Sequence, residues 1–156
     1  MKQKDTNGIK IVATNRKAYH NYEILETVEA GLVLQGTEVK ALREGSVQMA
    51  DAYASERRGE LYLEKLHISE YSHGNLQNHE PTRPRKLLLH KNQMIKLIEK
   101  SQEKGLTLLP LKIYFKQHYA KVELGLGRGK KMHDKRETLK NKALDRETER
   151  QYKINK

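Results

Sequence analysis

The residues best suited to bind a ligand stand in one run of glycines and cations, Gly125-Leu-Gly-Arg-Gly-Lys-Lys-Met-His-Asp-Lys-Arg136. Glycine has no Cβ, so three alternate glycines let the backbone bend freely and approach a ligand closely. The cations of this run are Arg128, Lys130, Lys131, Lys135 and Arg136. Positive charge on a flexible segment favours a phosphate-rich partner. A solvated linker without a ligand is the simpler interpretation of the same residues.

The same run does not fit the phosphate loop of a nucleotide hydrolase. That motif needs four residues between its glycines and a Ser or Thr after the Lys to hold magnesium. The segment Gly125-Leu-Gly-Arg-Gly129-Lys-Lys meets neither requirement. The sequence therefore does not predict nucleotide hydrolysis.

The histidines and carboxylates do not form a recognisable catalytic or metal-binding pattern. His67, His73 and His79 are six residues apart, unlike the ligands of a compact metal site, and the chain has no cysteine. We expect them to be histidines of a surface loop. The other candidates are a His-Asp pair without a nucleophile and a row of solvated carboxylates, at His133-Asp134 and at Glu23, Glu26 and Glu29. We therefore predict no catalytic residue, no metal and no cofactor.

The charge of the chain points to an anionic partner. The formal net charge is +11 over 156 residues, which favours nucleic acid without specifying a fold. Residues 127–156 carry eleven Lys or Arg and five Asp or Glu, so this segment holds +6 of the total. No apolar stretch has the length of a membrane span, and the first residues lack an apolar signal core. We expect a cytoplasmic protein that does not contact membranes.

The first half of the chain predicts two strands, each followed by a short helix, with strands at 9–13 and 22–34 and helices at 15–19 and 36–45. An N-cap needs a side-chain acceptor, which Thr14 or Asn15 offers to the first helix and Thr37 to the second. Gly31 is expected to bend the second strand, and Gly45 to end the second helix in a left-handed conformation. Strands at 52–57 and 60–68 then form a hairpin around Gly59. An exposed loop at 69–84 and a third helix at 90–104 follow.

The clearest strands are residues 106–116 and 119–126, in which apolar and polar residues alternate. Successive side chains of a strand point to opposite faces, so one face is predicted to join the core: Leu109, Leu111, Ile113, Phe115, Val122, Leu124 and Leu126. The other face offers cations for phosphates and rings for bases or sugars: Lys112, Tyr114, Lys116, Tyr119 and Lys121. Pro110 predicts a bulge or a sheet edge.

These elements predict a mainly β fold, a small antiparallel oligonucleotide-binding-like β-barrel with short flanking helices. Whether the barrel closes fully is left open. We expect the barrel to span residues 1–126 and a basic tail to span 127–156. Like charges repeat four residues apart in the tail, as at Arg136 and Lys140, and they weaken a solitary helix. We therefore expect a tail that is disordered in the free protein and helical when phosphates lie along it.

Five blocks of the sequence together resemble the SsrA-binding protein (small protein B) family of bacteria. They occur in family order and cover nearly everything outside the extreme ends: Asn15-Arg-Lys-Ala18, Glu29-Ala-Gly-Leu-Val-Leu-Gln-Gly-Thr-Glu-Val-Lys40, Leu42-Arg43, Pro81-Thr-Arg-Pro-Arg-Lys-Leu-Leu-Leu89 and Gly129-Lys-Lys-Met-His-Asp-Lys-Arg136. Any one block alone is a weak signal, whereas the five together are specific.

This resemblance implies a non-enzymatic RNA-binding adaptor of trans-translation. Its barrel would bind the tRNA-like domain of transfer-messenger RNA (tmRNA). Its tail would enter the small-subunit decoding centre and the mRNA channel of a stalled ribosome, in place of the missing anticodon arm. Elongation factor Tu would take part in delivering the alanyl-charged tmRNA. The outcome would be ribosome rescue and tagging of the nascent peptide for degradation.

The resemblance also implies individual roles. The residues implied to bind RNA are Asn15, Arg16, Lys17, Glu29, Arg83, Arg85, Lys86, Leu88 and Lys121. Those implied to engage the ribosomal decoding centre are Gly129, Lys130, Lys131, His133, Asp134, Lys135 and Arg136. Chemically, Lys121 suits a phosphate, Asn15 a sugar or base edge, and Leu88 an apolar contact with a base. Glu29 repels phosphate, so it would accept from a base amino group or orient a neighbouring lysine.

Two questions stay open at this level. Some family members carry a tryptophan in the tail near the position of Leu144, so the anchoring of the distal tail is uncertain, with Leu144, Tyr152 and Ile154 as candidate apolar anchors. The alternative function is that of a general basic ribosome-associated or translation-factor barrel that binds structured RNA. Selectivity for the tRNA-like RNA over bulk RNA would distinguish the two.

Overall fold

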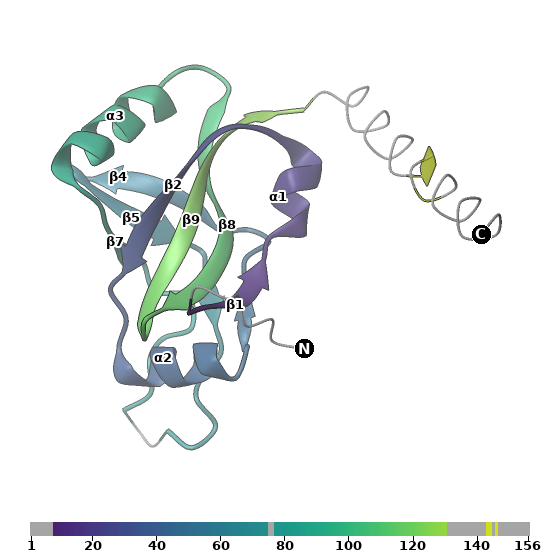
Figure 1. The fold of residues 1–156 in the computed structure, drawn as a ribbon. Helices are drawn as coiled ribbons and strands as arrows, with labels where there is room; N and C mark the ends of the chain where they lie inside the picture. The colour runs from purple at the N-terminus through teal and green to yellow at the C-terminus, as the bar shows by residue number, and fades with distance from the viewer. Residues whose placement is uncertain (1–7, 75–76, 131–142, 145, 147–156) are drawn as a thin grey trace.

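The computed structural model of the chain describes residues 8–74, 77–130, 143–144 and 146. Between residues 8 and 130 the chain forms a large antiparallel sheet, a small two-stranded sheet and three short helices (Figure 1). The mainly β prediction is confirmed. Among the tail residues, Ala143, Leu144 and Arg146 are helical and Leu144 is exposed. The predicted order of the rest of the tail lies outside the described residues.

The large sheet closes on itself as a barrel. Its ring runs through β8 (Leu106–Lys116), β4 (Tyr53–Arg57), β5 (Glu60–Glu64), β7 (Arg85–Leu88), β2 (Tyr22–Leu32) and β9 (Tyr119–Gly129), and β9 pairs again with β8. The narrowest join is between β4 and β8, where Ala54 opposite Leu108 is the single residue pair. Strand β1 (Ile9–Thr14) occupies the rest of that edge of β8. The barrel is therefore closed, which was left open from the sequence.

The helices cover the ends and one side of this barrel. Helix α2 (Gly36–Arg43) and helix α3 (Lys91–Ser101) lie at opposite ends, and α1 (Arg16–Asn21) lies beside β8 (Figure 1). Leu42 of α2 and Leu97 of α3 are buried in the same core as the barrel strands. The small second sheet pairs β3 (Val47–Gln48) with β6 (His67–Ile68).

Several local predictions are confirmed by the structure. Asn15 is the N-cap of α1, and its side chain accepts a hydrogen bond from the Ala18 backbone N–H. The two-residue turn between β4 and β5 uses Gly59 at a positive φ of 78°. Gly45 also has a positive φ, directly after the C-cap of α2. Pro110 marks a real bulge, because the register of β8 against β9 shifts between Pro110 and Lys112.

Other local predictions are wrong. Gln35 is the N-cap of α2, not Thr37, whose hydroxyl instead hydrogen-bonds to the His79 ring. Strand β2 ends at Leu32 rather than at residue 34, and its irregularity lies at Leu25, where its register against β9 shifts between Ile24 and Glu26. The segment 60–68 is two strands rather than one. Strand β7 was not predicted, because four residues after two prolines give too short an alternation to recognise.

The bulge in β8 also divides the predicted apolar face. Leu109 and Leu111 form a small cluster with Ala18 of α1, whereas Ile113 and Phe115 belong to the main core. An extra residue in one strand reverses the alternation beyond it, so Leu109 and Leu111 pack toward α1, whereas Ile113 and Phe115, beyond the bulge, pack in the main core. This is why one strand can both close the barrel and hold α1.

The glycine run is not a linker up to Gly129 but the second half of β9, where it pairs with β2. A Cβ at Gly125 would lie 2.6 Å from Leu111 Cδ1, and a Cβ at Gly127 would lie 3.0 Å from Tyr22 Cβ. These glycines therefore make room for neighbouring side chains rather than giving flexibility. The strand extends three residues beyond the predicted end at Leu126.

A buried ion pair joins α2 to β7. Glu38 and Arg85 are both fully buried, with 2.6 Å between a carboxylate oxygen and the Arg85 guanidinium. Arg83 also donates to Glu38, and Arg85 donates to the backbone oxygens of Leu66 and Pro81. Burial alone raises the pKa of Glu38, but hydrogen bonds from Arg83, the Gln35 backbone N–H and Arg85 outweigh it, so the pKa lies below its ordinary value.

Replacing Glu38 by Gln should destabilise the fold strongly, because it leaves the Arg85 charge buried without a counter-ion. We expect the free energy of unfolding at pH 7 to fall by about 3 kcal/mol or more. Because the folded pKa of Glu38 is lowered, its stabilisation is complete above about pH 5 and is lost as the pH falls through that lowered value. Urea unfolding of wild type and Glu38→Gln at several pH values should therefore converge in acid.

The matched control is Glu60→Gln, which removes an exposed carboxylate 3.8 Å from Lys86. This change should alter the free energy of unfolding by less than about 1 kcal/mol. Equal effects of the two substitutions would contradict the assigned role of the buried pair.

Candidate nucleic-acid interface

One row of directly paired residues crosses four strands of the barrel. Leu88 of β7 pairs with Gly31 of β2, Gly31 with Lys121 of β9, and Lys121 with Tyr114 of β8. Directly paired residues point to the same side of a sheet. Since the neighbours of Lys121 in β9, Ala120 and Val122, pack in or against the core, this side is the outside of the barrel. We call it the outer face and define it by Glu29, Gly31, Lys86, Leu88, Tyr114, Lys116 and Lys121.

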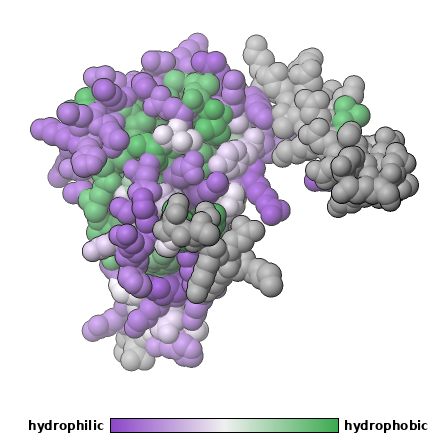
Figure 2. All heavy atoms as spheres, viewed as in Figure 1, coloured by the Kyte–Doolittle hydropathy of each residue, from purple (hydrophilic) through white to green (hydrophobic). Residues whose placement is uncertain are grey.

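An exposed leucine lies at one end of the outer face. Leu88 is 53% exposed, and its side chain lies against Gly31, where an added Cβ would be 3.3 Å from Leu88 Cβ. Lys86 precedes it by two residues and therefore points to the same side of β7. The space-filling view shows hydrophobic patches among mostly hydrophilic side chains on the visible side of the molecule (Figure 2). An apolar side chain beside cations suits a base with its phosphate.

A carboxylate orders the other end of the outer face. Glu29 accepts a hydrogen bond from the Tyr114 hydroxyl and lies 3.7 Å from the Lys116 ammonium. Burial, followed by this hydrogen bond and the charge of Glu29, raises the pKa of Tyr114. Tyr114 lies on the outward side of β8, as predicted, but it is only 9% exposed, so its ring is not open to a base. The contacts of Glu29 fit the orienting role considered for it from the sequence.

Asn15 is buried, and its side chain is hydrogen-bonded within the protein rather than free to bind a ligand. Its side-chain amide donates to the Pro110 backbone oxygen at 2.9 Å and to the Met49 backbone oxygen at 3.2 Å. With the cap to Ala18, both amide hydrogens and the oxygen are engaged. Asn15 therefore fixes α1 against β8 and against the segment before β4, and it offers no free group to a sugar or base.

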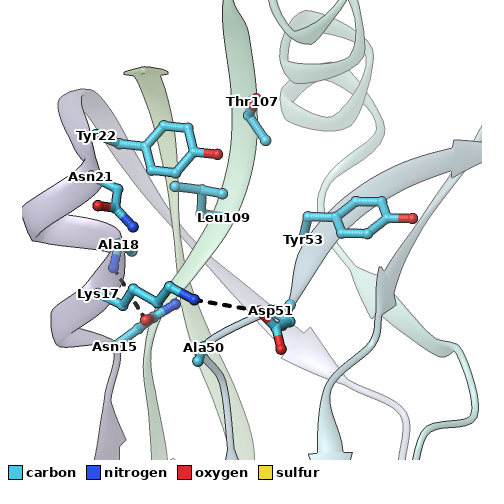
Figure 3. A pocket seen from close by; sticks show the side chains of 11 residues that line it. Asn15, Lys17, Ala18, Asn21, Tyr22, Ala50, Asp51, Tyr53, Thr107 and Leu109 are labelled. Carbon is cyan, nitrogen blue, oxygen red and sulfur yellow. Dashed lines mark hydrogen bonds and ion pairs between the residues drawn. The ribbon is translucent and has the colours of Figure 1, made fainter. Parts of the chain in front are cut away.

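The neighbours of Asn15 line a cavity of about 300 Å³ beside α1 (Figure 3). Lys17 lies on its α1 wall and reaches 3.6 Å from Asp51, while Tyr53 extends from the opposite wall. Lys17 and Asp51 are both well exposed, so water screens their attraction. Arg16 is exposed on α1 as well. These cations lie on α1, apart from the outer face.

The structure does not bring all the arginines of the sequence motif to the surface. Arg85 is fully buried against Glu38, and Arg83 is half-buried and donates to the same carboxylate. A guanidinium held this way is not available to a phosphate. Of the motif 81–89, only Lys86 and Leu88 contribute to the outer face.

The predicted decoding-centre residues are described only at their start. Gly129 ends β9 opposite Tyr22, and the Lys130 backbone N–H donates to the Asn21 backbone oxygen at 2.9 Å. The remaining predicted residues lie outside the described part of the chain: Lys131, His133, Asp134, Lys135 and Arg136.

The prediction of surface-loop histidines is wrong for His67 and His79. His67 belongs to strand β6, and its Nδ1 atom is buried. His79 is 3% exposed, and its ring hydrogen-bonds to the Thr37 hydroxyl and the Ile68 backbone oxygen. It therefore holds the loop before β7 against α2 and β6 rather than lying on the surface. Within the described residues, no three His, Asp or Glu side chains gather where they could hold a metal ion. Nor does any helix of that part of the chain combine the length and apolar character needed to cross a membrane.

Comparison with known proteins gives consistent matches. The family model described as SmpB protein matches residues 12–154. An SsrA-binding protein of Carboxydothermus hydrogenoformans is 57% identical over 141 residues, covering 90% of this chain and 95% of the relative. An SsrA-binding protein of Enterococcus faecalis is 54% identical over 147 residues, covering 94% and 96% respectively.

A solved structure gives the same result in three dimensions. A chain of the structure named "tmRNA-SmpB: a journey to the center of the bacterial ribosome" superposes with a TM-score of 0.67 and 55% identity. The match covers 78% of this chain and 85% of that chain.

Replacing Asn15 by Ala should weaken the whole fold. The change removes the α1 cap and leaves two buried backbone oxygens without their donor, so we expect a loss of about 2–3 kcal/mol in the free energy of unfolding. Thermal or urea unfolding measures this. The adjacent, exposed Arg16→Ala should change it by less than about 0.5 kcal/mol. Unchanged stability of Asn15→Ala would show that the hydrogen bonds of Asn15 do not stabilise the fold.

Proposed function

We propose the function of this chain from the premise that it belongs to the SmpB protein family: it is a tmRNA-binding adaptor of trans-translation that acts on the ribosome. It is an RNA-binding adaptor and not an enzyme. Its role in ribosome rescue follows from the same membership. The finer assignments below are our own and rest on the geometry of the outer face.

The observation that carries the RNA site is the row across β7, β2, β9 and β8. We propose that Lys121 and Lys86 bind phosphates of the tRNA-like domain, and that Leu88 packs on a base. Leu88 and Lys121 flank the same glycine, so a nucleotide lying over Gly31 can reach both. Gly31 itself is buried, and its missing side chain leaves the space in which Leu88 lies across the strands.

Glu29 contributes by holding its neighbours. Its bond with the Tyr114 hydroxyl and its approach to Lys116 support an orienting role beside a phosphate site. Asn15 and Arg85 contribute through the fold, since each is buried and fully engaged. Arg16 and Lys17 would add a separate cationic contact on α1.

We further propose that the barrel and the tail divide the work. The barrel would hold the tmRNA, and the tail from about residue 130 would enter the decoding centre and mRNA channel, through Gly129 to Arg136. Elongation factor Tu would accompany the alanyl-charged tmRNA, in the cytoplasm. The cluster of charge in residues 127–156, +6 of the +11, supports a second contact with RNA.

Replacing Lys121 by Ala should weaken binding of the tRNA-like RNA and reduce its salt dependence. Loss of one phosphate contact lowers the slope of log K against log salt by about one. Leu88→Ala should weaken binding about tenfold, equal to about 1.4 kcal/mol, with the salt slope unchanged. Filter binding or fluorescence anisotropy across salt concentrations measures both.

The control for these changes is Lys96→Ala, which removes an exposed cation on α3. It should leave specific affinity within about twofold. If Lys121→Ala and Leu88→Ala behaved like this control, the outer face would not be the RNA site. If wild type bound bulk RNA as tightly as the tRNA-like RNA, the general RNA-binding alternative would hold instead.

Truncation after Lys130 should separate the two activities. The cut preserves all of β9 and the bond between Lys130 and Asn21, so the barrel should keep its melting temperature and its affinity for the tRNA-like RNA. Peptide tagging on stalled ribosomes should be abolished. Loss of RNA binding with an intact barrel would mean that the tail is the main RNA contact.

A further inference from the structure

The turn between β8 and β9 carries two side chains in a conformation that favours glycine. Gln117 and His118 have φ of 51° and 72°, both in the left-handed region. A Cβ in this region crowds the following carbonyl oxygen, so residues with side chains are disfavoured there. Asn-Gly is the preferred pair for such a two-residue hairpin turn. In the other hairpin of the barrel, between β4 and β5, the second turn residue is Gly59.

The residue after this turn is an unusually exposed aromatic. Tyr119 is 70% exposed, more than any other large hydrophobic side chain in the described part of the chain. It pairs with Lys116 across the hairpin and precedes Lys121 by two residues. Tyr119 therefore points to the same side as Lys116 and Lys121, and it extends the outer face toward the hairpin tip.

The chemistry around this ring suits a nucleotide. An exposed tyrosine offers a flat face on which an unpaired base can stack without sequence preference. Lys116 lies directly opposite it on β8, Lys121 lies two residues farther along β9, and both can hold adjoining phosphates. The Gln117 amide and the His118 imidazole are both exposed and can hydrogen-bond to sugars or base edges.

We propose that Gln117, His118 and Tyr119 form an RNA contact at the hairpin tip, in which Tyr119 stacks on an unpaired base of the RNA held by the outer face. The proposal rests on the function given above and extends that site by one nucleotide. The strained turn is kept because its two side chains bind RNA, where Asn-Gly would stabilise the hairpin without them.

The decisive variant replaces Gln117 by Asn and His118 by Gly in the full chain. Relief of the left-handed strain should raise the melting temperature, while the loss of two contacting side chains should weaken binding of the tRNA-like RNA at least fivefold. A gain in stability with a loss in affinity separates this result from misfolding. If affinity stays within twofold of wild type, the turn residues are not contacts and the proposal fails for them.

The stacking residue is tested by Tyr119→Ala and Tyr119→Trp. Alanine should weaken binding about tenfold at every salt concentration, because stacking involves no phosphate, and tryptophan should retain wild-type affinity. The control is Ile95→Ala, which removes an exposed apolar side chain, 43% exposed, on α3 and should leave affinity unchanged. Equal affinities of wild type and Tyr119→Ala for the isolated tRNA-like RNA would overturn the proposal.

Two further comparisons assign the source of the base. Loss of affinity for the isolated tRNA-like RNA places the stacked base in tmRNA, whereas intact affinity with lost tagging on stalled ribosomes places it in ribosomal RNA. The first result supports the proposal, and the second overturns it, because the stacked base would then not belong to the RNA held by the outer face. Failure of the proposed function itself would look different, because wild type would then show no selectivity for the tRNA-like RNA and Lys121→Ala would have no effect.

Discussion

The buried pair of Glu38 and Arg85 is the constraint on which the outer face depends. It ties α2 to β7, and through Arg85 it also holds the backbone near Leu66 and Pro81. A charge without a partner inside a protein is strongly unfavourable, so neither residue can be satisfied unless β7 lies in its place. The same strand turns Lys86 and Leu88 outward. One short segment therefore carries a buried anchor on one side and candidate RNA contacts on the other.

Several glycines of this fold make room for neighbouring side chains rather than giving the backbone conformational freedom. Gly31 leaves room for Leu88 across the strands, and Gly125 leaves room for Leu111. Gly127 brings β9 close beneath Tyr22. In each case the missing side chain lets a larger neighbour pack against the backbone of a paired strand. Close packing around β2 and β9 thus requires glycine both in the glycine run, at Gly125 and Gly127, and on the outer face, at Gly31.

The alternation of β8 and β9 predicted correctly that Lys116, Tyr119 and Lys121 share the outer face, because a two-residue period follows directly from strand geometry. The inward direction of Arg85 could not be predicted, since a cation in an alternating pattern is normally on the solvent side. Its partner Glu38 lies 47 residues away along the chain. The resemblance had the same limit: it grouped Asn15, Arg85 and Lys121 by family role, and only packing separates the two buried residues from Lys121 on the outer face.

This separation changes how loss of RNA binding should be interpreted. A substitution at Lys121 or Leu88 acts on a surface that strands already hold in place, so a loss of affinity would report the loss of the proposed contact. A substitution at Asn15 or Arg85 acts first on the positions of α1 or β7, so an equal loss of affinity would come with a loss of stability. Because the outer face is built on paired strands, little of it must become ordered when RNA binds, and the contacts it makes are available for affinity. The chemistry of recognition then depends on the exposed side chains, and their placement depends on the buried ones.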